Sequence, residues 1–81
     1  AKAVGNNEYV LSGRLDIEKA NELFDLELPE SDEYQTIGGL ILHHHQSIPK
    51  AHEIITLDKF QFRMIKVTAT KIELVKLKVS E

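Results

Sequence analysis

The sequence predicts an α+β domain in which two short helices pack on a short antiparallel sheet, in the order β-α-α-β-β-β. Apolar residues recur at helical spacing in residues 17–24 and again in residues 37–44, as expected for two helices that each bury one face. Residues 53–79 instead carry β-branched and aromatic side chains in three runs separated by turn signals, which is typical of strands. A single pairing register for the last two runs keeps every opposed pair apolar, which indicates a hairpin.

The length of 81 residues allows one small domain, which we assign to residues 8–81. Residues 1–7 show no periodic apolar signal and are interpreted as a linker or disordered start. The chain has no cysteine, which excludes disulfides and thiolate sites. No apolar run approaches the ~18 residues of a membrane span, and no signal-peptide pattern is present. The domain is therefore expected to be soluble, without direct insertion into a membrane.

The first half of the domain is predicted to contain one strand and one helix. Residues 8–12 form the strand, which ends at a Ser-Gly turn signal. Asp16 occupies the N-cap position of the helix, where its carboxylate is expected to accept from backbone N–H groups. Pro29 prevents a continuous helix through the acidic connection, because the residue before a proline avoids helical geometry. The buried stripe of the helix is expected to contain Ile17, Ala20, Leu23 and Phe24.

A second helix is predicted from the N-cap Thr36 to His45, with Pro49 ending the element. Two glycines in its first turn, Gly38 and Gly39, cost roughly 1 kcal/mol each relative to alanine. Close packing of the helix backbone on the sheet is the expected compensation. The main face of this helix is expected to contain Ile37, Leu40, Ile41 and His44.

Three strands are predicted in the second half, at residues 53–57, 60–67 and 72–79, with a tight turn at 58–59. The register of the last two is defined by the pairs Phe60–Val79, Phe62–Leu77, Met64–Val75, Ile65–Leu74 and Val67–Ile72.

Near the middle of this hairpin, the apolar residues change from one set of alternate positions to the other, so that those near the tip would point to the opposite face of the sheet from those near the base. Two interpretations remain open. A bulge or a strong twist would bring both apolar groups onto one curved core. Alternatively, the hairpin tip faces outward and forms a surface for self-association or docking, made of Ile65, Val67, Ile72 and Leu74.

No residue pattern predicts a catalytic site or a metal centre. His43, His44 and His45 diverge by about 100° per residue on a helix, so they cannot converge on one ion, and His52 adds no helical His pair. The acidic run at 25–33 lacks the spacing that wraps calcium. The first turn of the second helix is a candidate for binding a phosphate or cofactor through backbone N–H groups, with packing as the alternative. Its candidate residues are Thr36, Gly38 and Gly39.

Charge is distributed unevenly along the chain. Acidic residues dominate positions 16–33 and basic residues dominate after position 58. Two solvated faces explain this pattern, and a basic sheet facing anionic lipid or a nucleotide is the alternative. The formal net charge of -3 gives no overall attraction to nucleic acid. Phe60 and Phe62 share the expected core face, which leaves no platform for stacking bases, so nucleic acid is not expected as a partner.

Several short segments follow one another in a distinctive order and spacing: Gly13-Arg14-Leu15, Leu23-Phe24, Leu28-Pro29, Tyr34-Gln35-Thr36-Ile37-Gly38-Gly39-Leu40, Ile48-Pro49 and the closing strands. Together they resemble the transporter-associated domain of the CorC/HlyC type, over residues 8–79. Two features depart from the family pattern. The histidines at 43–45 replace a helix end that is more often aliphatic and acidic, and residues 68–71 lack the usual glycine turn.

The resemblance implies a fold similar to the FAD-binding/transporter-associated domain-like fold. It also implies a cytoplasmic domain of a bacterial inner-membrane protein, placed after transmembrane domains and a pair of cystathionine-β-synthase (CBS) domains. Such proteins are described as hemolysin-like or as magnesium and cobalt efflux proteins. The implied role is regulation of ion transport without catalysis. We expect the domain to work by docking, as a homodimer, against a sibling domain or against the CBS pair of the parent protein. No cofactor is expected in that role; the alternative is a module that binds an adenine nucleotide or flavin (FAD).

Overall fold

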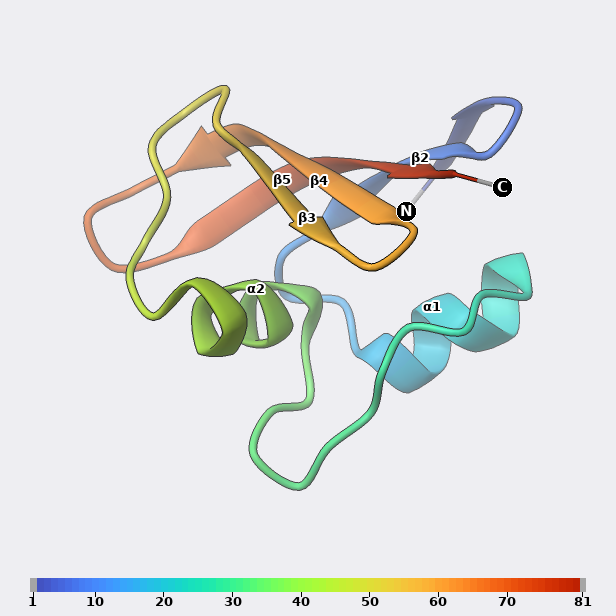
Figure 1. Ribbon diagram of the computed structural model, residues 1–81, viewed down its shortest axis with the longest axis horizontal. Helices are drawn as coiled ribbons and strands as arrows, with labels where there is room; N and C mark the ends of the chain where they lie inside the picture. The colour runs from blue at the N-terminus through green and yellow to red at the C-terminus, as the bar shows by residue number, and fades with distance from the viewer. Residues whose placement is uncertain (1, 81) are drawn as a thin grey trace.

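A computed structural model describes residues 2–80 of the chain. It contains a five-stranded antiparallel sheet with both helices on one of its faces (Figure 1). The predicted α+β class is therefore confirmed. The elements are β1 Lys2–Gly5, β2 Glu8–Ser12, α1 Ile17–Phe24, α2 Ile37–His45, β3 Ile54–Leu57, β4 Phe60–Val67 and β5 Ile72–Val79, and the strand order in the sheet is β1-β2-β5-β4-β3.

Strand β1 corrects the interpretation of residues 1–7 as a linker or disordered start; Ala1 lies outside the described residues. Lys2 lies opposite Val10 and Ala3 opposite Tyr9 in an antiparallel pair with β2. All four residues of β1 are exposed. The strand is held by its ladder with β2 rather than by burial, so no apolar periodicity marks it in the sequence.

The β4–β5 hairpin has the predicted bounds and four of its five predicted apolar pairs. The pair Ile65–Leu74 is wrong, because the ladder shifts register after Met64 and places Lys66 opposite Leu74. This irregularity agrees with the first of the two interpretations, in which a bulge interrupts the hairpin. The turn needs no glycine because the Thr68 hydroxyl accepts from the backbone N–H of Lys71 at 3.1 Å.

The bulge separates the four residues of the predicted hairpin-tip surface. Ile72 is only 6% exposed and belongs to the core, and Val67 packs against that core. Ile65 is 36% exposed and Leu74 is half-buried. The four side chains therefore do not form a single outward surface, and only Ile65 is a large exposed hydrophobic residue there.

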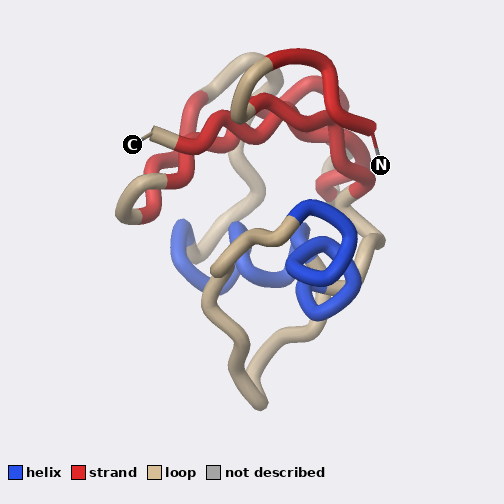
Figure 2. Tube along the Cα trace, turned by 90° about the vertical axis from the view of Figure 1, so that its right-hand side faces the viewer, coloured by secondary structure: helices blue, strands red, loops and turns tan. Residues whose placement is uncertain are grey.

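The core lies between the sheet and the helix layer (Figure 2). The sheet contributes the fully buried Leu11, Phe62, Met64, Val75 and Leu77. The helices contribute Ile17, Ala20, Ile37, Leu40 and Ile41.

Two residues predicted to face the core are exposed. Leu23 is 53% exposed, which corrects the predicted stripe of α1. It lies about 120° around the helix from Ile17, whereas Phe24 stays half-buried with its ring centroid 4.6 Å from that of Tyr9. His44 is also exposed, because it lies in the last turn of α2 and the chain returns to the core only afterwards, with the half-buried Ile48 and the buried Pro49.

The helix starts agree with the predicted cap positions, but only one cap works as expected. The Thr36 hydroxyl accepts from the Gly39 N–H at 3.0 Å, as an N-cap should. Asp16 occupies the N-cap position of α1 but makes no side-chain cap bond. Instead, the Ile17 N–H donates to the Gln35 carbonyl at 2.8 Å, which ties the start of α1 to the start of α2. The end of α2 is set by Gln46 in the left-handed conformation (φ 68°), before Pro49 is reached.

Candidate functional site

Three backbone segments meet almost without intervening side chains at what we call the glycine seam, formed by Gly13, Gly38 and the start of β5 at Ile72. The Gly13 N–H donates to the Glu73 carbonyl at 2.9 Å, and the Gly38 N–H donates to the Gly13 carbonyl at 2.8 Å. A Cβ at Gly13 would lie 1.8 Å from the Ile72 carbonyl oxygen, and one at Gly38 would lie 3.0 Å from the Gly13 oxygen. Close packing of the α2 backbone, the compensation expected for its glycines, is thus confirmed at Gly38.

The seam also determines what the first turn of α2 offers to a ligand. The N–H groups of Ile37 and Gly38 donate to backbone carbonyls at 2.9 and 2.8 Å, and the Gly39 N–H donates to the Thr36 hydroxyl at 3.0 Å. A phosphate bound there would have to replace these internal bonds. Anion or cofactor binding by Thr36, Gly38 and Gly39 stays a prediction, and their observed role is capping and packing.

A shallow hollow of about 370 Å³ lies beside the seam. Its walls are the three glycines, Leu42 and Ile48, and the hairpin residues 70–72 close one side. Arg14 and Lys71 bring two exposed cationic side chains to its lining. The arrangement has room for a small apolar or anionic group next to α2.

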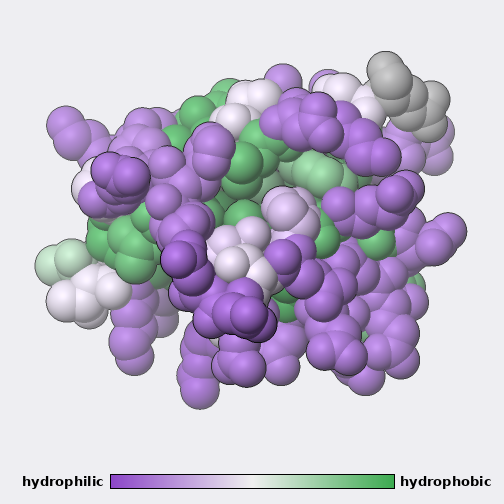
Figure 3. Space-filling model, turned by 60° about the horizontal axis from the view of Figure 1, so that its bottom comes forward, coloured by the Kyte–Doolittle hydropathy of each residue, from purple (hydrophilic) through white to green (hydrophobic). Residues whose placement is uncertain are grey.

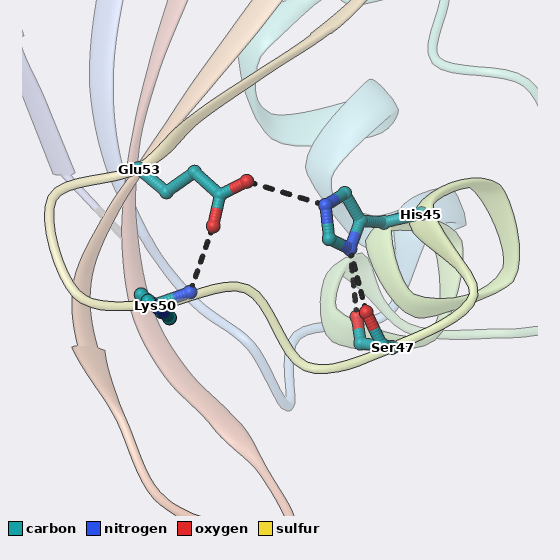
Figure 4. Close-up of polar contacts among 4 residues, drawn as sticks. All are labelled: His45, Ser47, Lys50 and Glu53. Carbon is teal, nitrogen blue, oxygen red and sulfur yellow. Dashed lines mark hydrogen bonds and ion pairs between the residues drawn. The ribbon is translucent and has the colours of Figure 1, made fainter.

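The end of α2 is tied to the turn before β3 by a polar network (Figure 4). His45 Nε2 lies 3.2 Å from a Glu53 carboxylate oxygen, and His45 Nδ1 lies 3.1 Å from both the carbonyl and the hydroxyl oxygen of Ser47. The other Glu53 oxygen accepts from the Lys50 backbone N–H at 3.0 Å. This N–H is the main cause that lowers the pKa of Glu53, and the nearby His45 adds to it. The network fastens the loop between α2 and β3.

The remaining histidines point elsewhere. His43 Nε2 lies 3.2 Å from the Glu33 carboxylate, and its ring centroid lies 5.3 Å from that of Tyr34. His52 has a positive φ of 70° in the turn before β3. Within residues 2–80, no group of three or more His, Asp or Glu side chains is placed to hold a metal ion.

Sequence reasoning missed the residue that organises the acidic connection between the helices. The Asn21 side chain donates to the Leu28 carbonyl at 3.1 Å and accepts from the Leu28 N–H at 2.9 Å. Both bonds join residues seven positions apart, so no local sequence pattern predicts them. Leu28 is thereby held in the core, only 3% exposed. The helix side of the molecule, where this connection protrudes, is mostly hydrophilic (Figure 3).

No helix covers the other face of the sheet (Figure 2). Arg63 of β4 and Lys76 and Lys78 of β5 alternate with the buried core residues of these strands and therefore belong to that face. A depression of about 400 Å³ on this face is lined by six residues. We call it the outer groove; it consists of Glu8, Ile54, Gln61, Arg63, Lys76 and Lys78. Lys76 Nζ lies 2.9 Å from a Glu8 carboxylate oxygen. This hydrogen bond and the charge of Lys76 hold the pKa of Glu8 below its ordinary value.

Comparison with known proteins gives consistent matches. A family model described as the transporter-associated domain CorC_HlyC matches residues 2–81. A UPF0053 protein of Buchnera aphidicola is 32% identical over 73 residues, which are 89% of this chain and 14% of that protein. A protein named possible hemolysin C, from Rickettsia canadensis, is 27% identical over 79 residues, which are 96% of this chain and 26% of that protein. The solved transporter-associated domain CorC_HlyC of Nitrosomonas europaea has a TM-score of 0.85 at 28% identity, covering 99% of this chain and 95% of that one.

The chain therefore spans about a seventh to a quarter of the length of these two curated relatives (14% and 26%). It spans nearly all of the solved domain. Neither α1 nor α2, the helices within residues 2–80, is long and apolar enough to cross a membrane.

Proposed function

Because this chain belongs to the CorC_HlyC family of transporter-associated domains, we propose that it is a non-catalytic regulatory and interaction domain that modulates ion transport. The observation that carries this proposal is the match of the family model to residues 2–81, nearly the whole chain. The small share of the relatives that the chain covers supports a modular role, since most of each relative lies outside the matched region. In this proposal the transport itself takes place in those other parts.

The mechanism we propose is a shift of populations. Contacts that the domain makes in one state of the transporter and not in the other favour the first state, by the difference in contact free energy. The domain acts on the cytoplasmic side of a bacterial inner membrane, next to CBS and transmembrane domains of the same protein. It works as a homodimer, with the exposed Ile65 near the hairpin tip as part of the contact.

The test is ion flux in proteoliposomes that contain the full-length protein bearing this domain. Flux of Mg²⁺ and Co²⁺ is compared with that of a version lacking residues 8–79, after equal membrane insertion has been verified. Regulation predicts that flux persists in the shortened protein while its rate, or its dependence on adenine nucleotide, changes. Unchanged flux and unchanged nucleotide dependence would contradict the proposal. Ile65→Asp, with Thr56→Asp on the exposed face of β3 as a control, tests dimer formation by sedimentation.

A second candidate function is the binding of an adenine nucleotide or flavin in the hollow beside the glycine seam. Its volume of about 370 Å³ falls within the roughly 300–1,000 Å³ of ligand pockets, and Arg14 and Lys71 supply positive charge. The test is visible absorbance of the purified domain, together with the change in melting temperature on adding FAD or ADP. Binding that Lys71→Gln weakens, and that the control Lys59→Gln leaves unchanged, would favour this function. No absorbance and no change in melting temperature would exclude it.

A further inference from the structure

The outer groove concentrates unpaired positive charge on a molecule whose net charge is negative. Arg63 on β4 lies directly opposite Lys76 on β5, and Gln61 lies directly opposite Lys78. Directly opposed residues in an antiparallel ladder share a face, with Cβ atoms about 4.5–5.5 Å apart. By this register the four residues occupy neighbouring positions on one face of β4 and β5, the face that no helix covers. Figure 1 shows both helices on the other side of the sheet.

This arrangement is unfavourable for the fold taken alone, since like charges directly opposite in a sheet are destabilising. The Glu8 carboxylate offsets the charge of Lys76 through their 2.9 Å contact. Arg63 and Lys78 have no carboxylate within ion-pair distance among residues 2–80. Glu8 also lies directly opposite Lys78, and the charge of Lys78 contributes to lowering the Glu8 pKa, so Lys78 is partly compensated. Arg63 has no such partner among the described residues of this depression of about 400 Å³, where three cations face one carboxylate.

The chemistry of these groups suits one class of ligand. The planar guanidinium of Arg63 can donate two parallel hydrogen bonds to a phosphate, which a lysine cannot do. Lys78 supplies a second positive charge from the neighbouring strand, and the Gln61 amide supplies a neutral donor beside both. Ile54, opposite Arg63 on β3, provides an apolar wall. A group with several charged oxygens can contact both strands at once, whereas a single carboxylate offers only two oxygens.

We propose that the outer groove is a binding site for a phosphate group, held by Arg63 and Lys78 with Gln61 between them. The groove is distinct from the hollow beside the glycine seam, and no residue lines both. The proposal does not depend on a role in transport. The phosphate belongs either to a soluble phosphorylated compound or to an anionic lipid headgroup, and the experiment distinguishes these sources.

The first part of the experiment is a titration of the ¹⁵N-labelled domain with inorganic pyrophosphate, followed by amide chemical shifts. The expected result is a set of shifts confined to the strands that line the groove, β2, β3, β4 and β5. The double variant R63Q/K78Q should weaken this binding at least tenfold, since each lost charge-assisted hydrogen bond corresponds to roughly that factor. The control K19Q removes an exposed cation from α1 and should leave the affinity within about twofold. Far-UV circular dichroism verifies that the variants fold.

The second part measures co-sedimentation with vesicles of phosphatidylcholine, with and without phosphatidylglycerol. Pyrophosphate binding that R63Q/K78Q weakens supports the site with a soluble ligand. Binding to anionic vesicles alone, again weakened by R63Q/K78Q, supports the site with a lipid headgroup. The proposal is overturned if neither probe binds, or if the double variant binds as well as the K19Q control.

Discussion

Replacing Gly13 by alanine is the sharpest test of how the two layers are joined. The Gly13 backbone lies directly against β5, so that an added Cβ would be 1.8 Å from the Ile72 carbonyl oxygen and 2.8 Å from its carbonyl carbon. The φ angle of Gly13 is not positive. The expected damage therefore comes from contact with the backbone of β5 and not from a conformation that alanine cannot adopt.

The size of the effect follows from the distance that must be gained. The Cβ–oxygen separation has to grow by at least about 1.2 Å to reach 3.0 Å. A movement of that size takes the Gly13–Glu73 hydrogen bond from 2.9 Å past the usual range. Loss of a buried bond costs about 1–3 kcal/mol, and overpacking costs a similar amount. We expect unfolding free energy to fall by about 3 kcal/mol, from a total of roughly 4–12 kcal/mol for a chain of this size.

Urea and thermal unfolding, followed by far-UV circular dichroism, measure this change. The melting temperature of Gly13→Ala should fall by roughly 12–24 °C. Gly5→Ala is the matched control in β1, because its Cβ would meet nothing closer than 3.9 Å. Gly38→Ala should lie between them, since its 3.0 Å contact opposes a gain in helix propensity of about 1 kcal/mol. A Gly13→Ala protein within 1 kcal/mol of the parent would refute this account of the seam.

Three further predictions concern polar contacts. Thr36→Ala removes a side-chain cap and should lower the unfolding free energy by about 1 kcal/mol. Asp16→Ala removes no cap bond and should lower it less. Urea unfolding compares the two variants, and equal losses would contradict the assignment of caps. Asn21→Ala removes two bonds to the backbone of the acidic connection and should cost about 1–3 kcal/mol, with faster hydrogen exchange in that connection; unchanged exchange would show that the bonds do not restrain it. The lowered pKa of Glu8 stabilises the fold above the unfolded value of about 4.3, and this contribution is lost as the pH falls through the folded pKa. Lys76→Gln removes the main hydrogen-bond and charge partner of Glu8. In this variant the Glu8 carboxyl should titrate at a higher pH, as measured by NMR, and the unfolding free energy should fall less steeply as the pH is lowered. An unchanged midpoint of the Glu8 titration would contradict this cause.

The fold could be predicted largely because its strongest signals are local or depend on apolar pairing. The β4–β5 register follows from matching apolar residues across the hairpin, and this succeeded at Phe62–Leu77 and Met64–Val75. It failed at Ile65, because the ladder shifts register after Met64 and shifts back before Val67, and hydrophobicity alone does not locate these irregularities. Strand β1 was missed because all four of its residues are exposed, so that its sequence shows no alternation of buried and exposed positions.

The candidate sites were less predictable because they depend on contacts between distant residues. Gly38 was correctly linked to close packing, but its partner Gly13 lies 25 residues earlier and makes the tighter contact. The sequence also could not tell that the N–H groups of Ile37 and Gly38 donate to the carbonyls of Leu15 and Gly13. The outer groove depends on the order of β3, β4 and β5 in the sheet, which places Arg63 between Ile54 and Lys76.

The separation of charge between the two faces bears on how an anion would be selected. The net charge of -3 repels an anion at long range, whereas the outer groove attracts it only nearby. Exposed charges more than about 8–10 Å away are largely screened at physiological salt. The acidic connection lies on the helix side of the sheet (Figure 1), so its repulsion is weakened at the outer face. Binding would then depend on short contacts to Arg63 and Lys78 more than on electrostatic steering, which favours selectivity for the shape of the bound group over speed of association.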